Sequence, residues 1–82
     1  MSPVDLARNI LDATLQLGGR ARAFTPETPL LGSIPELDSM AVVQIVTAIE
    51  EQLGVTVGDD EISADTFETL GALARFIEEK QG

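Results

Sequence analysis

The chain has 82 residues and a net charge of −9, and it contains no histidine, cysteine, tryptophan or tyrosine. Without thiolate or imidazole side chains, it lacks the ligands of a usual zinc site and the partners of a Ser-His or Cys-His catalytic pair. The acidic excess disfavours nucleic acid as a partner, because neutralising phosphates requires clustered lysine and arginine. There is no apolar run of about 20 residues and no signal-peptide pattern, so we expect a cytoplasmic protein without a membrane span.

The hydrophobic share is 44% and mostly aliphatic, which predicts a folded domain rather than a disordered acidic tail. A chain of this length allows a single domain, residues 1–82. The net charge comes from the middle of the chain, because residues 23–74 contain ten acidic side chains and no basic one.

The first predicted helix covers residues 3–17, where Leu6, Ile10 and Leu17 recur at helical spacing. Gly18 and Gly19 are expected to end it. Residues 19–38 contain three prolines and no sustained period, which predicts a long loop. Four apolar side chains of this loop are expected to pack on the core: Leu30, Leu31, Ile34 and Leu37.

The second predicted helix, residues 39–53, has the clearest pattern of the chain. Asp38 or Ser39 is expected to cap it and Gly54 to end it. One face is apolar and predicts burial, and it consists of Val42, Ile45, Val46, Ile49 and Leu53.

The remaining residues predict a short helical turn and a last helix. Residues 55–57 alternate like a strand, but without a partner strand they favour a loop. A turn is expected at residues 59–62. The last predicted helix covers residues 69–80, with Thr66 or Thr69 as its starting residue, and it is expected to bury Leu70, Leu73, Ala74 and Ile77. The prediction is an all-α four-helix bundle, with three main helices, one short helix and a long loop between the first two.

Two features of the second helix are candidates for function. Its face opposite the core stripe contains Met40 and Val43, which are either ordinary exposed apolar residues or part of a docking surface rimmed by Glu50 and Glu51. Ser39 is either a capping residue or a hydroxyl that another enzyme modifies, because the chain has no histidine to activate it as a nucleophile.

Leu37-Asp38-Ser39-Met40 and the helix that runs to Glu50-Glu51-Gln52-Leu53-Gly54 resemble the acyl carrier proteins, which have a D-S-[LM] motif at the start of their second helix. The likeness continues through Asp59-Asp60-Glu61 and Phe67-Glu68-Thr69-Leu70 and so covers nearly the whole chain. The last of these stretches looks closer to carriers of polyketide, peptide or D-alanyl pathways. The run Pro35-Glu36-Leu37-Asp38-Ser39-Met40 also resembles stand-alone carriers of bacterial exosortase and exopolysaccharide loci.

The sequence departs from the family at three positions. Glu36 stands where many members have glycine, and Ala41 and Gln44 stand where many fatty-acid carriers have acidic residues. These differences argue against a role with the housekeeping fatty-acid synthase.

The resemblance implies a carrier without catalysis of its own. Ser39, flanked by Asp38 and Met40, would hold 4′-phosphopantetheine, transferred from coenzyme A by a phosphopantetheinyl transferase. The thiol of this arm would carry an acyl or aminoacyl group as a thioester for fatty-acid or polyketide-type biosynthesis. The chain would act as a monomer and meet acyl-activating or acyl-transferring enzymes with basic patches through Glu36, Met40, Val43, Gln44, Thr47, Glu50 and Glu51.

Several alternatives stay open from the residues alone. The chain could be a non-enzymatic acidic interaction module without a prosthetic group, whereas a small enzyme with paired carboxylates lacks room for a pocket. Ile45, Ile49, Leu53, Leu70 and Leu73 either form a plain core or receive a fatty chain. The acidic residues 59–61 lack the pattern of an EF-hand loop and predict a solvated turn without a metal site, with weak binding of a divalent cation that relieves charge repulsion as the alternative.

Overall fold

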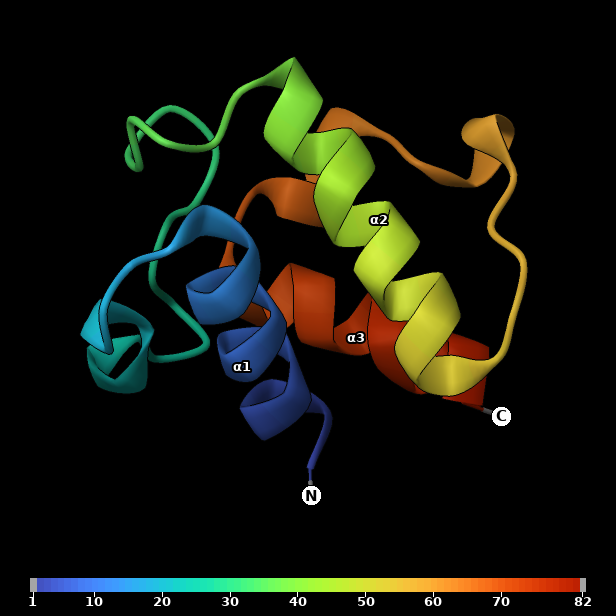
Figure 1. The fold of residues 1–82 in the computed structure, drawn as a ribbon, viewed down its shortest axis with the longest axis horizontal. Helices are drawn as coiled ribbons and strands as arrows, with labels where there is room; N and C mark the ends of the chain where they lie inside the picture. The colour runs from blue at the N-terminus through green and yellow to red at the C-terminus, as the bar shows by residue number, and fades with distance from the viewer. Residues whose placement is uncertain (1, 82) are drawn as a thin grey trace.

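In a computed structural model of the protein, residues 2–81 are described, apart from the side chain of Asp59, and they form three α-helices (Figure 1). α1 covers Pro3–Leu15, α2 covers Ser39–Leu53 and α3 covers Leu70–Gln81, with 3-10 segments η1 at Arg20–Ala23, η2 at Asp59–Glu61 and η3 at Ala64–Phe67. The described residues contain no strand, only an isolated bridge between Pro29 and Thr69. The all-α prediction is therefore confirmed, although two 3-10 segments stand in place of the single short helix.

α1 begins as predicted but ends two residues early. Ser2 caps it by accepting the N–H of Asp5 at 3.2 Å, and Pro3 is its first residue. After Leu15, Gln16 adopts a left-handed conformation (φ 53°), and its N–H donates to the carbonyl of Asp12. The Asp12 carboxylate then accepts the N–H groups of Gly19 at 3.1 Å and Ala21 at 3.2 Å. This bonding by Asp12 turns the chain into η1 and makes the glycines part of the turn rather than the helix end.

The core lies where α1 packs against α3 and α2. It is aliphatic apart from Phe67 and Phe76, and no described polar or charged side chain is buried in it. Ile45 and Ile49 of the α2 stripe are fully buried, whereas Val42, Val46 and Leu53 are partly buried at its edge. α3 faces inward through the four predicted residues, Leu70, Leu73, Ala74 and Ile77.

The long loop is fastened to the start of α3 by backbone hydrogen bonds. The N–H of Leu30 donates to the carbonyl of Glu68 at 3.0 Å, and that of Leu31 donates to Phe67 at 2.9 Å. Leu30 and Leu37 are buried and Ile34 is partly buried, as predicted, but Leu31 is 45% exposed. In this extended segment successive side chains point to opposite sides, so burying Leu30 turns Leu31 outward.

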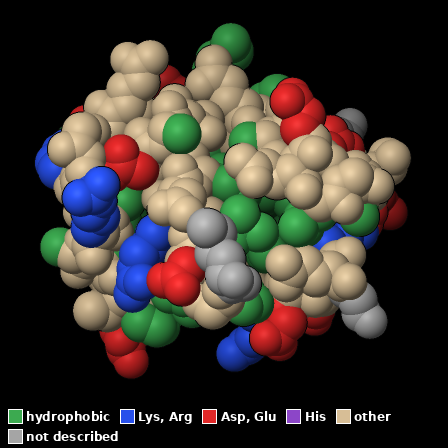
Figure 2. All heavy atoms as spheres, turned by 60° about the horizontal axis from the view of Figure 1, so that its bottom comes forward, with side chains coloured by type: hydrophobic (Ala, Val, Ile, Leu, Met, Phe, Trp, Pro, Cys, Tyr) green, Lys and Arg blue, Asp and Glu red, His purple; other side chains and the backbone are tan. Residues whose placement is uncertain are grey.

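Charge is unevenly distributed over the fold. α2 contains no basic residue, whereas α1 and η1 contribute Arg8, Arg20 and Arg22. Figure 2 shows several Lys and Arg side chains on the side where Figure 1 places α1 and η1, with others at its lower edge and on its right. Among the described residues, no helix is long and apolar enough to cross a bilayer.

Candidate functional site

The start of α2 presents Ser39 on a rigid element. Asp38 has an extended backbone (φ −113°, ψ −173°), and its carboxylate accepts the N–H of Ala41 at 2.8 Å. Asp38 is therefore the N-cap, a role that the sequence left open between Asp38 and Ser39. Ser39 is the exposed first residue of the helix, and its hydroxyl makes no hydrogen bond within the part of the chain that is described. This hydroxyl has no capping role and is accessible to another enzyme.

Two buried residues hold this exposed start in place. Leu37 is only 6% exposed and donates its N–H to the carbonyl of Ile34 at 3.0 Å, and Ala41 is 4% exposed. Between them, the side chains of Asp38, Ser39 and Met40 all face solvent. The first turn of a helix offers backbone N–H groups and a partial positive charge, which favour an anionic group such as a phosphate beside Ser39.

We predict that Asp38→Ala destabilises the fold by about 0.5–2 kcal/mol, because the N–H of Ala41 loses its partner. Asp38→Asn keeps a side-chain oxygen at the cap and should recover most of this loss. Urea unfolding of both variants at the same pH measures the difference. Equal midpoints for Asp38→Ala and Asp38→Asn would contradict the capping role.

The outer face of α2 is exposed next to Ser39. Met40 is 69% and Val43 is 62% exposed, and with Leu31 they are the large hydrophobic side chains that the described surface exposes most. Three polar residues share this exposure: Gln44, Thr47 and Glu51. We call the five residues Met40, Val43, Gln44, Thr47 and Glu51 the α2 outer face. They are exposed, as the sequence predicts, and run along α2 from Met40, next to the serine, to Glu51 near the end of the helix.

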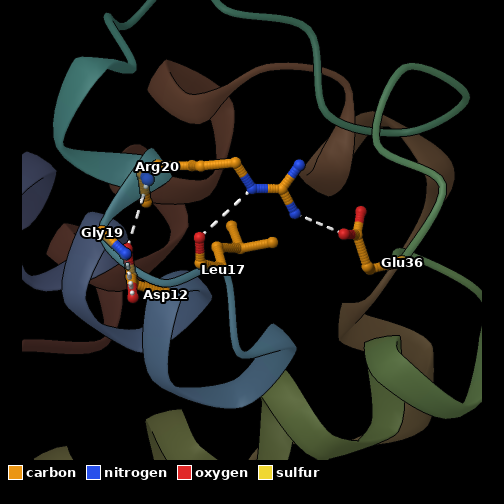
Figure 3. Close-up of polar contacts among 6 residues, drawn as sticks. Asp12, Leu17, Gly19, Arg20 and Glu36 are labelled. Carbon is orange, nitrogen blue, oxygen red and sulfur yellow. Dashed lines mark hydrogen bonds and ion pairs between the residues drawn. The ribbon is translucent and has the colours of Figure 1, made fainter.

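The two other acids of the predicted docking surface make contacts within the fold. Glu50 is half-buried, and its carboxylate accepts the N–H of Val57 at 2.7 Å, which ties the end of α2 to the following segment. Glu36 is bound by the guanidinium of Arg20, which also donates from Nε to the carbonyl of Leu17 at 3.2 Å (Figure 3). The hydrogen bond from Arg20 holds the pKa of Glu36 below its ordinary value.

Sequence reasoning missed Arg20 as a neighbour of the site. Figure 3 shows its side chain reaching from the segment after α1 toward Glu36, on the loop that leads into α2. The two residues are 16 positions apart, so no local pattern joins them. The ion pair links η1 to the loop that leads to Ser39.

Two grooves lie between α2 and neighbouring segments of the chain. One of about 340 Å³ lies between α2 and the segment around residues 57–62, and Val42, Val46, Val57 and Ile62 contribute an apolar lining. The other, of about 290 Å³, lies between the end of α1 and the start of α2. Of the five residues expected either to form a plain core or to receive a fatty chain, Ile45, Ile49, Leu70 and Leu73 are fully buried in one cluster, and Leu53 is partly buried against it.

The acidic turn makes structural contacts of its own. The Glu61 carboxylate accepts the N–H of Gly58 at 2.8 Å and pairs with the ammonium of Lys80 from α3. The backbone N–H of Gly58, followed by Lys80, lowers the pKa of Glu61. Among the described side chains, which exclude that of Asp59, no group of three or more carboxylates could hold a metal ion. The side chain of Asp59 lies outside the described residues, and with it the alternative of weak cation binding at this turn.

We predict that Glu61→Gln lowers the unfolding temperature at neutral pH and that this deficit disappears in acid. The folded-state pKa of Glu61 lies below its ordinary value of 4.5, so its carboxylate stabilises the fold above that pH and stops doing so as pH falls through the lowered pKa. Thermal melts from about pH 7 to about pH 3 follow the deficit. Glu51→Gln removes the same charge from an exposed site as a control, and a Glu61→Gln deficit that persisted at the acid end would contradict the prediction.

Comparison with known proteins identifies the class to which this arrangement belongs. A family described as the phosphopantetheine attachment site matches residues 8–77. The solution NMR structure of a holo acyl carrier protein from Nitrosomonas europaea superposes with a TM-score of 0.89 at 56% sequence identity, covering 98% of this chain and 96% of that one. The chain therefore belongs to the acyl carrier protein family.

This membership determines the general activity. The protein is a carrier and not an enzyme, and its cofactor is covalently bound 4′-phosphopantetheine. Phosphopantetheinyl transferases and acyl-handling enzymes are the partners that the family implies. The start of α2 fits this cofactor, because it combines an exposed hydroxyl without a hydrogen-bond partner in the described chain and a helix end that favours a phosphate.

Proposed function

We propose that Ser39 carries the 4′-phosphopantetheine arm within a single carrier domain of residues 1–82. The observation that supports this most strongly is the division of roles between two adjacent residues. Asp38 caps α2, which leaves the hydroxyl of Ser39 exposed and unbonded among the described residues. When attached, the arm supplies a thiol that holds an acyl or aminoacyl group as a thioester, and this explains how a chain without cysteine serves as a carrier.

We further propose that the α2 outer face receives partner enzymes. Met40 and Val43 supply apolar contact area, and Glu51 attracts basic patches on the partner. Glu36 and Glu50 contribute less charge than the sequence suggested, because Arg20 and the N–H of Val57 already bind them. A small patch of this kind suits short-lived contacts of a monomeric carrier that must leave after each transfer.

Two residues in the first turns of α2 favour a specialised pathway over the housekeeping fatty-acid synthase. Ala41 and Gln44 replace acidic residues that many fatty-acid carriers place early in this helix, and Ala41 is buried. The proposed partners therefore meet a less acidic start of α2. Because coenzyme A donates the arm, we place the protein in the cytoplasm, where this donor is available.

The proposal is tested by incubating the purified apo chain with coenzyme A and a promiscuous phosphopantetheinyl transferase and then measuring the intact mass. We expect a gain of one phosphopantetheine group per chain. An established carrier protein in a parallel reaction controls for active transferase. If that control is loaded and this chain gains nothing, the chain is an interaction module without the prosthetic group and the proposal fails.

A further inference from the structure

The polar groove between α1 and α2 lies beside the neighbours of the proposed attachment residue. Its volume is about 290 Å³, and its lining includes Asp38 and Met40, the residues on either side of Ser39. Glu36 also lines it and is held in place by Arg20. Ser39 does not itself line the groove, but both of its chain neighbours do, so a flexible chain attached to its hydroxyl is tethered within one residue of the groove and even weak contacts are populated at a high effective concentration.

The chemistry of the groove matches an amide-containing ligand. Gln16 lines it from the end of α1 and Gln44 from α2, with the hydroxyl of Thr14 nearby on α1. No hydrogen bond joins these three side chains to other described residues. A carboxamide both donates and accepts hydrogen bonds, so it can pair with the N–H and the carbonyl of another amide. The pantetheine portion of the cofactor contains such amides.

Gln16 also occupies an unusual backbone position. Its φ of 53° makes it the one non-glycine residue with a left-handed backbone in the described chain. The residue that follows the last turn of a helix in this conformation is most often glycine, because a Cβ is disfavoured there. Glycines do occupy the nearby left-handed positions 18 and 19. A glutamine at position 16 therefore suggests a use for its side chain beyond ending α1.

From these observations, and resting on the proposed attachment at Ser39, we propose that the α1–α2 groove is a docking site for the amide section of the phosphopantetheine arm. Gln16 and Gln44 bind the arm's amides, and Thr14 adds a hydroxyl. The volume of the groove lies just below the lower end of the roughly 300–1,000 Å³ range of drug-sized ligand sites, so in this proposal it holds a section of the arm and leaves its thiol end free.

The test is NMR spectroscopy of the holo protein, with a labelled chain and an unlabelled arm. We expect nuclear Overhauser contacts between the arm and the side-chain NH₂ groups of Gln16 and Gln44. We also expect shifts of both groups between the apo and holo forms. In Gln16→Ala combined with Gln44→Ala, the arm should lose its contacts with Thr14. Gln52→Ala, which removes an exposed glutamine near the far end of α2, is the matched control and should leave the contacts unchanged.

Two results would overturn the inference. Contacts of the arm confined to residues 38–40 would show that it does not dock, and contacts with Val46 and Ile62 alone would place it in the apolar groove instead. Intact mass separates this failure from failure of the proposed function. A chain that gains the arm but shows neither glutamine contact disproves the docking site only, whereas a chain that gains no arm disproves the attachment itself.

Discussion

Ser39→Ala is expected to abolish loading by a phosphopantetheinyl transferase while changing the free energy of unfolding by less than about 0.5 kcal/mol. The loss is complete because the substitution removes the hydroxyl that would bond to the phosphate. Stability is preserved because Asp38, not Ser39, bonds the N–H of Ala41, and because the Ser39 side chain is exposed. Intact mass and urea unfolding of the same preparation measure the two effects.

Ser33→Ala is the matched control, because Ser33 is another exposed serine on the loop that leads to α2. It should load as fully as the wild type. Loading of Ser39→Ala would show that the arm is attached elsewhere. A large loss of stability in Ser39→Ala would instead show that this serine has a structural role that the contacts do not reveal.

Gly71→Ala is expected to destabilise the protein by about 1–2 kcal/mol, although alanine usually favours a helix. A Cβ at position 71 would lie 2.9 Å from the carbonyl oxygen of Pro26 and 3.3 Å from its Cβ. The same oxygen accepts the N–H of Gly71 at 2.8 Å, so the loop cannot move away without losing that bond. Gly71 is in the first turn of α3, where the helix gains less from alanine than it would in the interior.

Gly58→Ala provides the comparison for Gly71→Ala. A Cβ there would lie 2.7 Å from the carboxylate of Asp60, which can rotate away, and at an ordinary contact distance of 3.5 Å from that of Glu61, and it would meet no backbone atom. Its cost in urea unfolding should be the smaller of the two. A Gly71→Ala variant that is more stable than the wild type would show that the Pro26 segment yields freely, contrary to the packing described.

Periodic features of the sequence predicted much of the fold. The apolar stripe of α2 and its end at Gly54 are observed, because core packing and a left-handed glycine act within a few residues. The end of α1 was placed wrongly because the carboxylate of Asp12 binds N–H groups seven and nine residues further along. The expected burial of Leu31 was wrong for a similar reason, since the direction of its side chain depends on the backbone hydrogen bond between Leu31 and Phe67.

The site was predictable only in part. Asp38-Ser39-Met40 identified the position of the serine through a family resemblance, and the alternation of buried and exposed residues on α2 predicted its outer face. The sequence could not show that Glu36 and Glu50 are bound within the fold, because their partners lie on other elements. For the same reason, the groove that joins Gln16 to Gln44 was missed, since it exists only where α1 packs beside α2.

The central claim, attachment at Ser39, is tested most directly by locating the added group in the loaded chain. Cleavage after glutamate yields the fragment 37–50, in which Ser39 is the one serine, and the fragment 28–36, which contains Ser33. We expect the mass of phosphopantetheine on fragment 37–50 alone, with tandem spectra assigning it to Ser39. Finding that mass on fragment 28–36, or on Thr47 within fragment 37–50, would contradict the account.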